Sequence, residues 1–139
     1  MSTFVLIAFT MSIILFQISC QKDANAQTTK SIQGLWIGTY TVDNQPDLGQ
    51  QYFSLIIKPD GTMIADTRGL DKQHLAPGTW NLSHDTLTCS FTCVYGLPIN
   101  IGVTEKSTAV WDKSGTLTGT WQNDPTPTGS GKITLTKVD

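Results

Sequence analysis

Short segments in which apolar and polar residues alternate, separated by turn residues, run through residues 34–138 of this 139-residue chain. In residues 87–95 every second residue is apolar or aromatic: Leu87, Cys89, Phe91, Cys93 and Tyr95. Successive side chains of a β-strand point to opposite faces, so this segment has one apolar and one polar face, as in an antiparallel strand that covers a core on one side. Helical periodicity is almost absent. The sequence therefore predicts an all-β protein.

Turn residues divide the chain into about eight antiparallel strands. The clearest turn is Lys58-Pro59-Asp60-Gly61, and residues 67–77 are expected to be irregular. Eight strands joined by hairpins leave two exposed edges unless the sheet closes, so we expect a small up-and-down barrel. Such a barrel is nearly filled by side chains or holds one small ligand. The expected strands are residues 34–40, 52–58, 62–66, 78–82, 87–95, 103–112, 116–122 and 132–138.

Size and charge limit what this chain can do. Its length suits a single domain, and we expect a monomer. Charged residues make up 14% of the chain and the net charge is −2, so no basic surface is available to bind nucleic acid. Cys89 and Cys93 lie four strand residues apart, about 13 Å, which is beyond the reach of a disulfide.

The first 31 residues read as a targeting segment. Residues 4–18 form an apolar run of signal-peptide length. Ile18-Ser19-Cys20 resembles the lipobox of bacterial lipoproteins, which implies a signal peptide over residues 1–20, a palmitate-type lipid anchor on Cys20 and an outer-membrane address in the cell envelope. Alternatively, cleavage after Ala26 would release a secreted or periplasmic chain. Residues 21–31 are polar and predict a flexible tether ahead of a domain over residues 32–139.

Three of the four tryptophans follow a Gly-x motif, at Gly34-Leu35-Trp36, Gly78-Thr79-Trp80 and Gly119-Thr120-Trp121. The first motif resembles the Gly-x-Trp of the calycin barrels, and the whole domain is similar to small lipocalin-like lipoproteins of the Bacteroidetes. That resemblance implies that Trp36 plugs one end of a lipocalin-like barrel. Lipocalins cover this ring with an arginine near the last strand. Here Lys132 or Lys137 would have to replace it.

The residues give little sign of catalysis. Glu105 is the only glutamate, and most aspartates fall in turns. His74 and His84 lack metal-ligand spacing, so we expect no metal and no cofactor. The two cysteines of the fifth strand are expected to be small buried residues rather than a thiol site. A barrel enzyme would require His74 or His84 to face a cavity.

Binding is the function that the sequence favours. Aromatic residues on several strands are expected to line a pocket away from the Trp36 plug, or simply to fill the core. We therefore expect a non-enzymatic barrel that binds a small apolar or amphipathic ligand. The alternative is a protein-binding lipoprotein, such as an inhibitor of an attacking hydrolase, acting through loops 43–51 and 124–131. The candidate pocket residues are Tyr40, Trp80, Phe91, Tyr95, Trp111 and Trp121.

Overall fold

The computed structural model describes residues 30–125 and 129–139. The predicted signal peptide, Cys20 and both predicted cleavage sites lie outside the described residues. The described chain is all-β, with two 3-10 helices of three residues each, η2 (Pro46–Leu48) and η3 (Pro98–Asn100), as its only helical elements. The strands are β1 (Gly34–Tyr40), β2 (Gln51–Ile57), β3 (Thr62–Gly69), β4 (Lys72–Ser83), β5 (Thr86–Thr92), β6 (Thr104–Trp111), β7 (Thr116–Asp124) and β8 (Ser130–Lys137).

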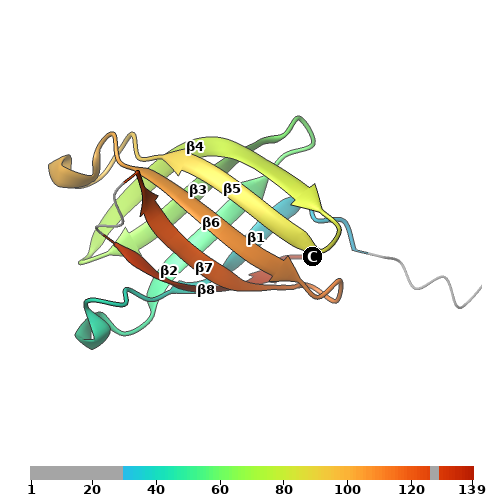
Figure 1. Ribbon diagram of the computed structural model, residues 1–139, viewed down its shortest axis with the longest axis horizontal. Coiled ribbons are helices and arrows are strands. Elements are labelled where there is room, and N and C mark those ends of the chain that lie inside the picture. The colour runs from blue at the N-terminus through green and yellow to red at the C-terminus, as the bar shows by residue number, and fades with distance from the viewer. Residues whose placement is uncertain (1–29, 126–128) are drawn as a thin grey trace, which may run out of the picture.

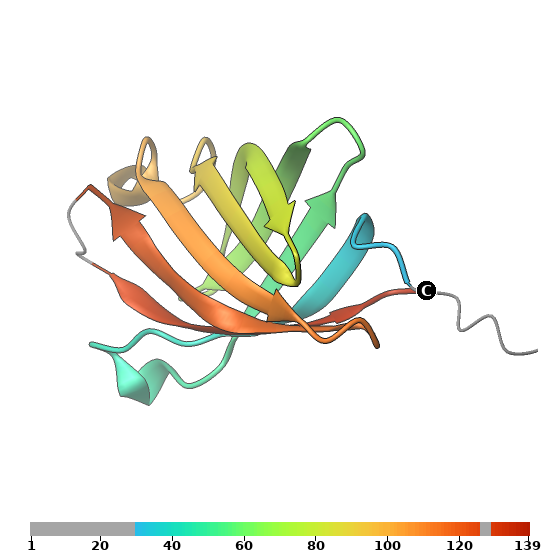
Figure 2. The ribbon, with the colours of Figure 1, turned by 45° about the vertical axis from the view of Figure 1, so that its right-hand side comes forward.

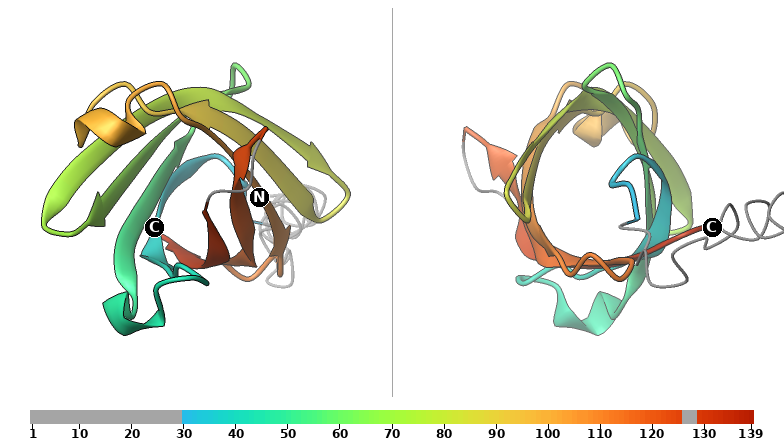
Figure 3. Two further views of the ribbon diagram at one scale, coloured as in Figure 1. Left: turned by 60° about the vertical axis from the view of Figure 1, so that its left-hand side comes forward. Right: turned by 90° about the vertical axis from the view of Figure 1, so that its right-hand side faces the viewer.

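The eight strands form a closed antiparallel barrel, which confirms the predicted architecture. Each strand pairs with its neighbour in sequence, and β1 also pairs with β8. Trp36 of β1, for example, lies opposite Leu55 of β2 on one side and Lys137 of β8 on the other. The strands form a complete ring when the barrel is viewed along its length (Figure 3).

The core is built from the inward half of each strand. Burial alternates along β5 and β8, and Ile133 and Leu135 of β8 point inward. Cys89 and Cys93 are both buried and free, so the prediction that they are not bonded to each other is also confirmed. The fully buried side chains of greatest volume are Trp36, Leu55, Ile57, Met63, Leu87, Leu117, Ile133 and Leu135.

Residues 67–77 are not irregular, so that part of the prediction is wrong. β3 and β4 continue through this stretch and are joined by a two-residue turn at Leu70 and Asp71, whose φ angles are 51° and 60°. Two positive φ angles are typical of the tight turn that matches strand twist. The turn could not be predicted because neither Leu70 nor Asp71 is glycine or asparagine. The longer β4 could not be predicted because Pro77 is unusual within a strand.

β5 is shorter than predicted. It ends at Thr92, and Tyr95 lies beyond it in a single bridge to Leu75. The Tyr95 side chain is 59% exposed, so the expectation that it shares the inward face of this strand is wrong. In the sequence, apolar and polar residues alternate up to Tyr95, whereas the strand itself ends at Thr92.

Two glycines allow neighbouring strands to approach closely. A Cβ atom on Gly38 would lie 2.0 Å from the carbonyl oxygen of Thr134, and one on Gly119 would lie 2.0 Å from that of Thr108. Real Cβ atoms do not approach an oxygen so closely, so only glycine fits while the strands keep this curvature. Gly38 thus allows β8 to lie close against β1.

The two ends of the barrel differ. The short turns after β2, β4 and β6 lie at the end that also holds the C-terminus, which we call the closed end. The longer connections that contain η2 and η3 are both at the opposite end, on different sides of the barrel, and we call this the open end (Figures 1 and 2).

Trp36 seals the closed end. Its side chain is 0% exposed, and its indole Nε1 donates a hydrogen bond to the carbonyl oxygen of Ile32 at 2.7 Å. The ammonium of Lys137 lies 5.9 Å from the centre of the Trp36 ring and donates to the carbonyl oxygens of Ser31 and Gln33. Lys137 therefore supplies the cation that the sequence led us to expect over this ring.

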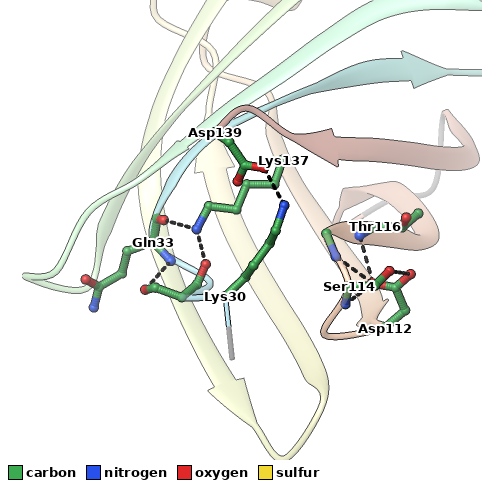
Figure 4. A network of polar contacts seen from close by, with 9 residues as sticks. Lys30, Gln33, Asp112, Ser114, Thr116, Lys137 and Asp139 are labelled. Atoms are coloured by element: carbon green, nitrogen blue, oxygen red, sulfur yellow. Dashed lines mark hydrogen bonds and ion pairs between the residues drawn. The ribbon is translucent and has the colours of Figure 1, made fainter. Parts of the chain in front are cut away.

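Polar contacts attach the start of the described chain to the same end. Lys30 forms an ion pair with Asp139 beside Lys137 (Figure 4). In the neighbouring turn the carboxylate of Asp112 accepts hydrogen bonds from three backbone N–H groups, those of Ser114, Gly115 and Thr116. Lys30 and Ser31, at the end of the predicted tether, thus contact the barrel.

Candidate functional site

A cavity of about 330 Å³ occupies the open half of the barrel. Residues from all eight strands line its walls, and residues of the connections before β2 and before β6 line its mouth. Its volume lies at the lower end of the range found for small-molecule sites. Trp36 is not among the lining residues, so the cavity lies away from the closed-end plug, as expected from the sequence.

Four aromatic rings form a connected wall around this cavity, which we call the aromatic wall: Tyr40, Phe53, Phe91 and Trp121. The Tyr40 ring meets Phe53 edge-on at 6.2 Å between centroids and Trp121 edge-on at 5.9 Å. Phe53 in turn lies 6.3 Å from Phe91. Trp121 is held in place because its Nε1 donates to the carbonyl oxygen of Thr41 at 2.9 Å. These contacts give the cavity one rigid aromatic side, while polar side chains such as Thr67 and Asn123 also line it.

Glu105 adds an acidic side chain to the cavity lining. It lies on β6, directly opposite Phe91 of β5 and Asn123 of β7 in the strand register, and it lines the cavity. Burial raises the pKa of its carboxyl group to about 7. No ion pair or hydrogen bond joins this carboxyl group to another side chain in the described residues.

The charge of the Glu105 carboxyl group also contributes to the pKa values of two neighbouring side chains, Tyr40 and Cys93. Burial, with a smaller contribution from the charge of Glu105, raises the pKa of the Tyr40 hydroxyl. Burial is likewise the main reason that the pKa of the Cys93 thiol is raised, and Glu105 adds to it. A thiol with a raised pKa stays protonated at neutral pH, so Cys93 is poorly suited to act as a nucleophile.

His74 faces the cavity, whereas His84 is exposed in the turn after β4. His74 Nε2 lies 3.0 Å from the side-chain nitrogen of Asn100, at hydrogen-bond distance, and its ring packs against Gly96. The cysteine of this region, Cys93, is engaged elsewhere because its Sγ donates to the carbonyl oxygen of Tyr95. The histidine is thus used to hold the connection before β6 in place, and the contacts provide no paired nucleophile and base.

The six predicted pocket residues divide between the two ends. Tyr40, Phe91 and Trp121 line the cavity, and the other three do not. Trp80 points inward near the closed end, where its Nε1 donates to the carbonyl oxygen of Lys58 at 2.8 Å. Trp111 is 8% exposed and belongs to the core, and Tyr95 lies at the exposed rim of the open end.

Sequence reasoning did not select Glu105 or Phe53 as site residues. The signal for Glu105 was present, because it has the same strand parity as Trp111, which was expected to line the pocket or fill the core. Phe53 stands out less, since it follows Tyr52 within β2, a strand that has apolar residues on both faces.

Comparison with protein-family models, curated proteins and solved structures found no match for this chain. Within residues 30–125 and 129–139 no group of three or more His, Cys, Asp or Glu side chains is arranged to hold a metal ion. In the same residues no helix has the length and apolarity required to cross a membrane.

Proposed function

We propose that this chain is a non-enzymatic binding protein that holds one small amphipathic molecule in the open half of its barrel. The observation that carries the proposal is the cavity of about 330 Å³ with an aromatic wall and a single acidic side chain. A few polar groups in an otherwise apolar pocket are typical of small-molecule sites. The resemblance to lipocalins agrees with this proposal and remains a prediction.

Filling the cavity tests this function. Ala76 is buried, lines the cavity and lies on β4, so Ala76→Leu places extra carbon atoms inside it. The purified protein should bind the neutral fluorescent probe N-phenyl-1-naphthylamine, and 1-octanol should displace the probe. We expect Ala76→Leu to weaken probe binding, while Thr79→Leu, on the exposed face of the same strand, leaves it unchanged. Equal probe binding by all three proteins would contradict a ligand site in the barrel.

We further propose that the protein is held at the cell envelope through a lipid on Cys20. Support comes from the apolar run and the lipobox-like Ile18-Ser19-Cys20. Cys20→Ala should leave the protein in the soluble fraction and remove the mass of the lipid. A variant that stays membrane-bound with an unchanged mass difference from the precursor would contradict this assignment and favour another anchor.

A protein-binding role is the second candidate, and one observation favours it. The open end carries a rim of exposed apolar side chains, among which Ile99 is 83% exposed. This rim does not coincide with the predicted binding loops 43–51 and 124–131, and residues 126–128 of the latter lie outside the described residues. The rim consists of Leu70, Val94, Tyr95, Ile99 and Ile101.

The two functions can be separated by changing the rim alone. Val94→Ser with Ile101→Ser changes two exposed rim residues that do not line the cavity, and should leave binding of N-phenyl-1-naphthylamine in the barrel intact. If capture of a secreted hydrolase depends on the rim, the same double variant should lose it. Loss of probe binding without any effect on hydrolase capture would count against the second candidate.

A further inference from the structure

The charge balance of the cavity limits which ligands it can hold. Its lining contains four ionisable side chains, Tyr40, His74, Cys93 and Glu105, and no lysine, arginine or aspartate within the described residues. The nearby cation on β6, Lys106, belongs to the outer face and pairs with Asp124 at 3.0 Å. The only group of the lining that carries a negative charge near neutral pH is therefore the carboxylate of Glu105, and no permanent cation of the lining balances it.

The surroundings of Glu105 suit a cation. Phe91 lies directly opposite Glu105 on β5, and Trp121 lies on the inward face of β7. Tyr40 is close enough that the charge of Glu105 contributes to the raised pKa of its hydroxyl group. The π-faces of aromatic rings attract an ammonium ion, most strongly where water is excluded. A carboxylate beside such rings adds a charge-assisted hydrogen bond.

An anionic ligand meets the opposite situation. The head group of a fatty acid would bring a second carboxylate beside Glu105, and two like charges in a poorly solvated site raise each other's pKa and repel. Neutralising that head group requires a lysine or arginine, which the described lining lacks. A neutral alcohol would avoid repulsion but would leave the carboxylate without an opposite charge.

We propose, on the basis of the binding function proposed above, that the ligand is a small amphipathic amine whose ammonium group pairs with Glu105 and whose apolar body lies against the aromatic wall. The charge of Glu105 is then the feature that selects this class of ligand from other molecules of similar size. Asn100 and His74 lie at the mouth, engaged with each other, and take no part in this pairing.

The ionisation of Glu105 makes the pairing dependent on pH. Its pKa of about 7 in the free protein means that the carboxylate form increases between pH 6 and pH 8. An alkylammonium ion resembles that of lysine, with a pKa of about 10.4, and stays charged over this range. Of the other groups that face the cavity, Tyr40 and Cys93 stay neutral because burial raises the pKa of each. His74 is the fourth ionisable side chain of the lining.

Three probes with the same apolar chain test this assignment: n-octylamine, 1-octanol and octanoate, each measured by displacement of N-phenyl-1-naphthylamine from the purified protein at pH 6 and pH 8. Octylamine should bind most tightly at pH 8, and octanoate most weakly. Glu105→Gln keeps the shape of the side chain and should weaken octylamine binding by about tenfold or more, with little change for octanol. Asp124→Asn removes a carboxylate outside the cavity and serves as the matched control.

The outcomes separate this inference from the proposed function. If octanol and octylamine bind equally and Glu105→Gln affects neither, the amine assignment is wrong while the ligand site stands. If no probe binds the wild-type protein and the dye does not either, the binding function itself fails. A loss of octylamine affinity that is equal in Glu105→Gln and Asp124→Asn would indicate general surface attraction and would also overturn the assignment. His74→Gln should retain the pH effect if Glu105 is its source.

Discussion

Glu105→Gln should change how the stability of the barrel depends on pH. The ordinary pKa of a glutamate is 4.5, and burial raises the pKa of Glu105 to about 7. The folded protein then binds the proton more tightly than the unfolded chain does. As pH rises from 4.5 to 7 the unfolded chain loses this proton first, so the free energy of unfolding falls across this interval. Above pH 7 the full cost of ionising the buried carboxyl group is present.

The size of this effect follows from the two pKa values. The pKa of Glu105 rises from 4.5 in the unfolded chain to about 7 in the folded protein. Each pKa unit corresponds to about 1.4 kcal/mol, so the difference amounts to about 3 kcal/mol. Glutamine has no proton to lose and is free of this cost. We therefore expect Glu105→Gln to match the wild type near pH 4.5 and to exceed its free energy of unfolding by up to about 3 kcal/mol at pH 8. That is a large fraction of the stability of a small domain.

Urea unfolding followed by tryptophan fluorescence at pH 5 and pH 8 measures this difference. The variant is compared with the wild type at the same pH, so the contributions of all other ionisable groups cancel. A stability difference that is the same at both pH values would refute the reasoning. It would mean that the carboxyl group of Glu105 is solvated in the folded protein and carries no raised pKa.

Three other substitutions probe the construction of the barrel. Gly119→Ala should lower the free energy of unfolding by about 1–3 kcal/mol, because the new Cβ atom would lie 2.0 Å from the carbonyl oxygen of Thr108 and force β7 away from β6. Lys137→Met should cost about 1–2 kcal/mol through loss of the cation over Trp36 and of two hydrogen bonds, with unchanged probe binding at the far end. Asp112→Ala should lower the Tm at pH 7. That deficit should shrink in acid, since hydrogen bonds hold the pKa of Asp112 below its usual range and its contribution is lost on protonation.

Matched controls exist for two of these substitutions. Thr120→Ala changes an exposed position on the same strand as Gly119, and Lys132→Met removes an exposed lysine from the same strand as Lys137. If Thr120→Ala lowers stability as much as Gly119→Ala, the cause is strand propensity and not the close approach of β7 to β6. If Lys132→Met lowers stability as much as Lys137→Met, the cause is loss of a charge and not loss of the contact with the Trp36 ring.

Alternation and turn chemistry were sufficient to predict the strand number and the closed barrel. The Pro59-Asp60-Gly61 turn forms as expected, with the carboxylate of Asp60 accepting from the backbone N–H of Thr62 at 2.9 Å. The hairpin at Leu70 and Asp71 was missed because leucine rarely adopts positive φ, although aspartate tolerates it. Local propensity gave the wrong answer there because pairing of β3 with β4 over eight residue pairs outweighs it.

Only three of the six predicted pocket residues line the cavity, and the reason is geometric. Strand parity decides whether a side chain points inward, but its height along the barrel depends on strand direction and register. Trp80 and Trp111 point inward as expected, yet both lie near the ends of strands that run toward the closed end, where they pack with the core. Trp121 follows the same motif as Trp80 on a strand of the opposite direction, so it reaches the cavity instead.

The position of the chain's first described residues bears on how a ligand would arrive. Lys30 and Ser31 are fixed to Asp139 and Lys137 at the closed end, so the segment that carries Cys20 joins the barrel there (Figure 4). If Cys20 carries a lipid as proposed, its tether joins the barrel at the end opposite the mouth of the cavity. Attachment to the bilayer then leaves the mouth open to solution, where a soluble amphipathic amine can reach it. The exposed apolar rim around Ile99 surrounds the same mouth and is likewise on the end of the barrel opposite Lys30.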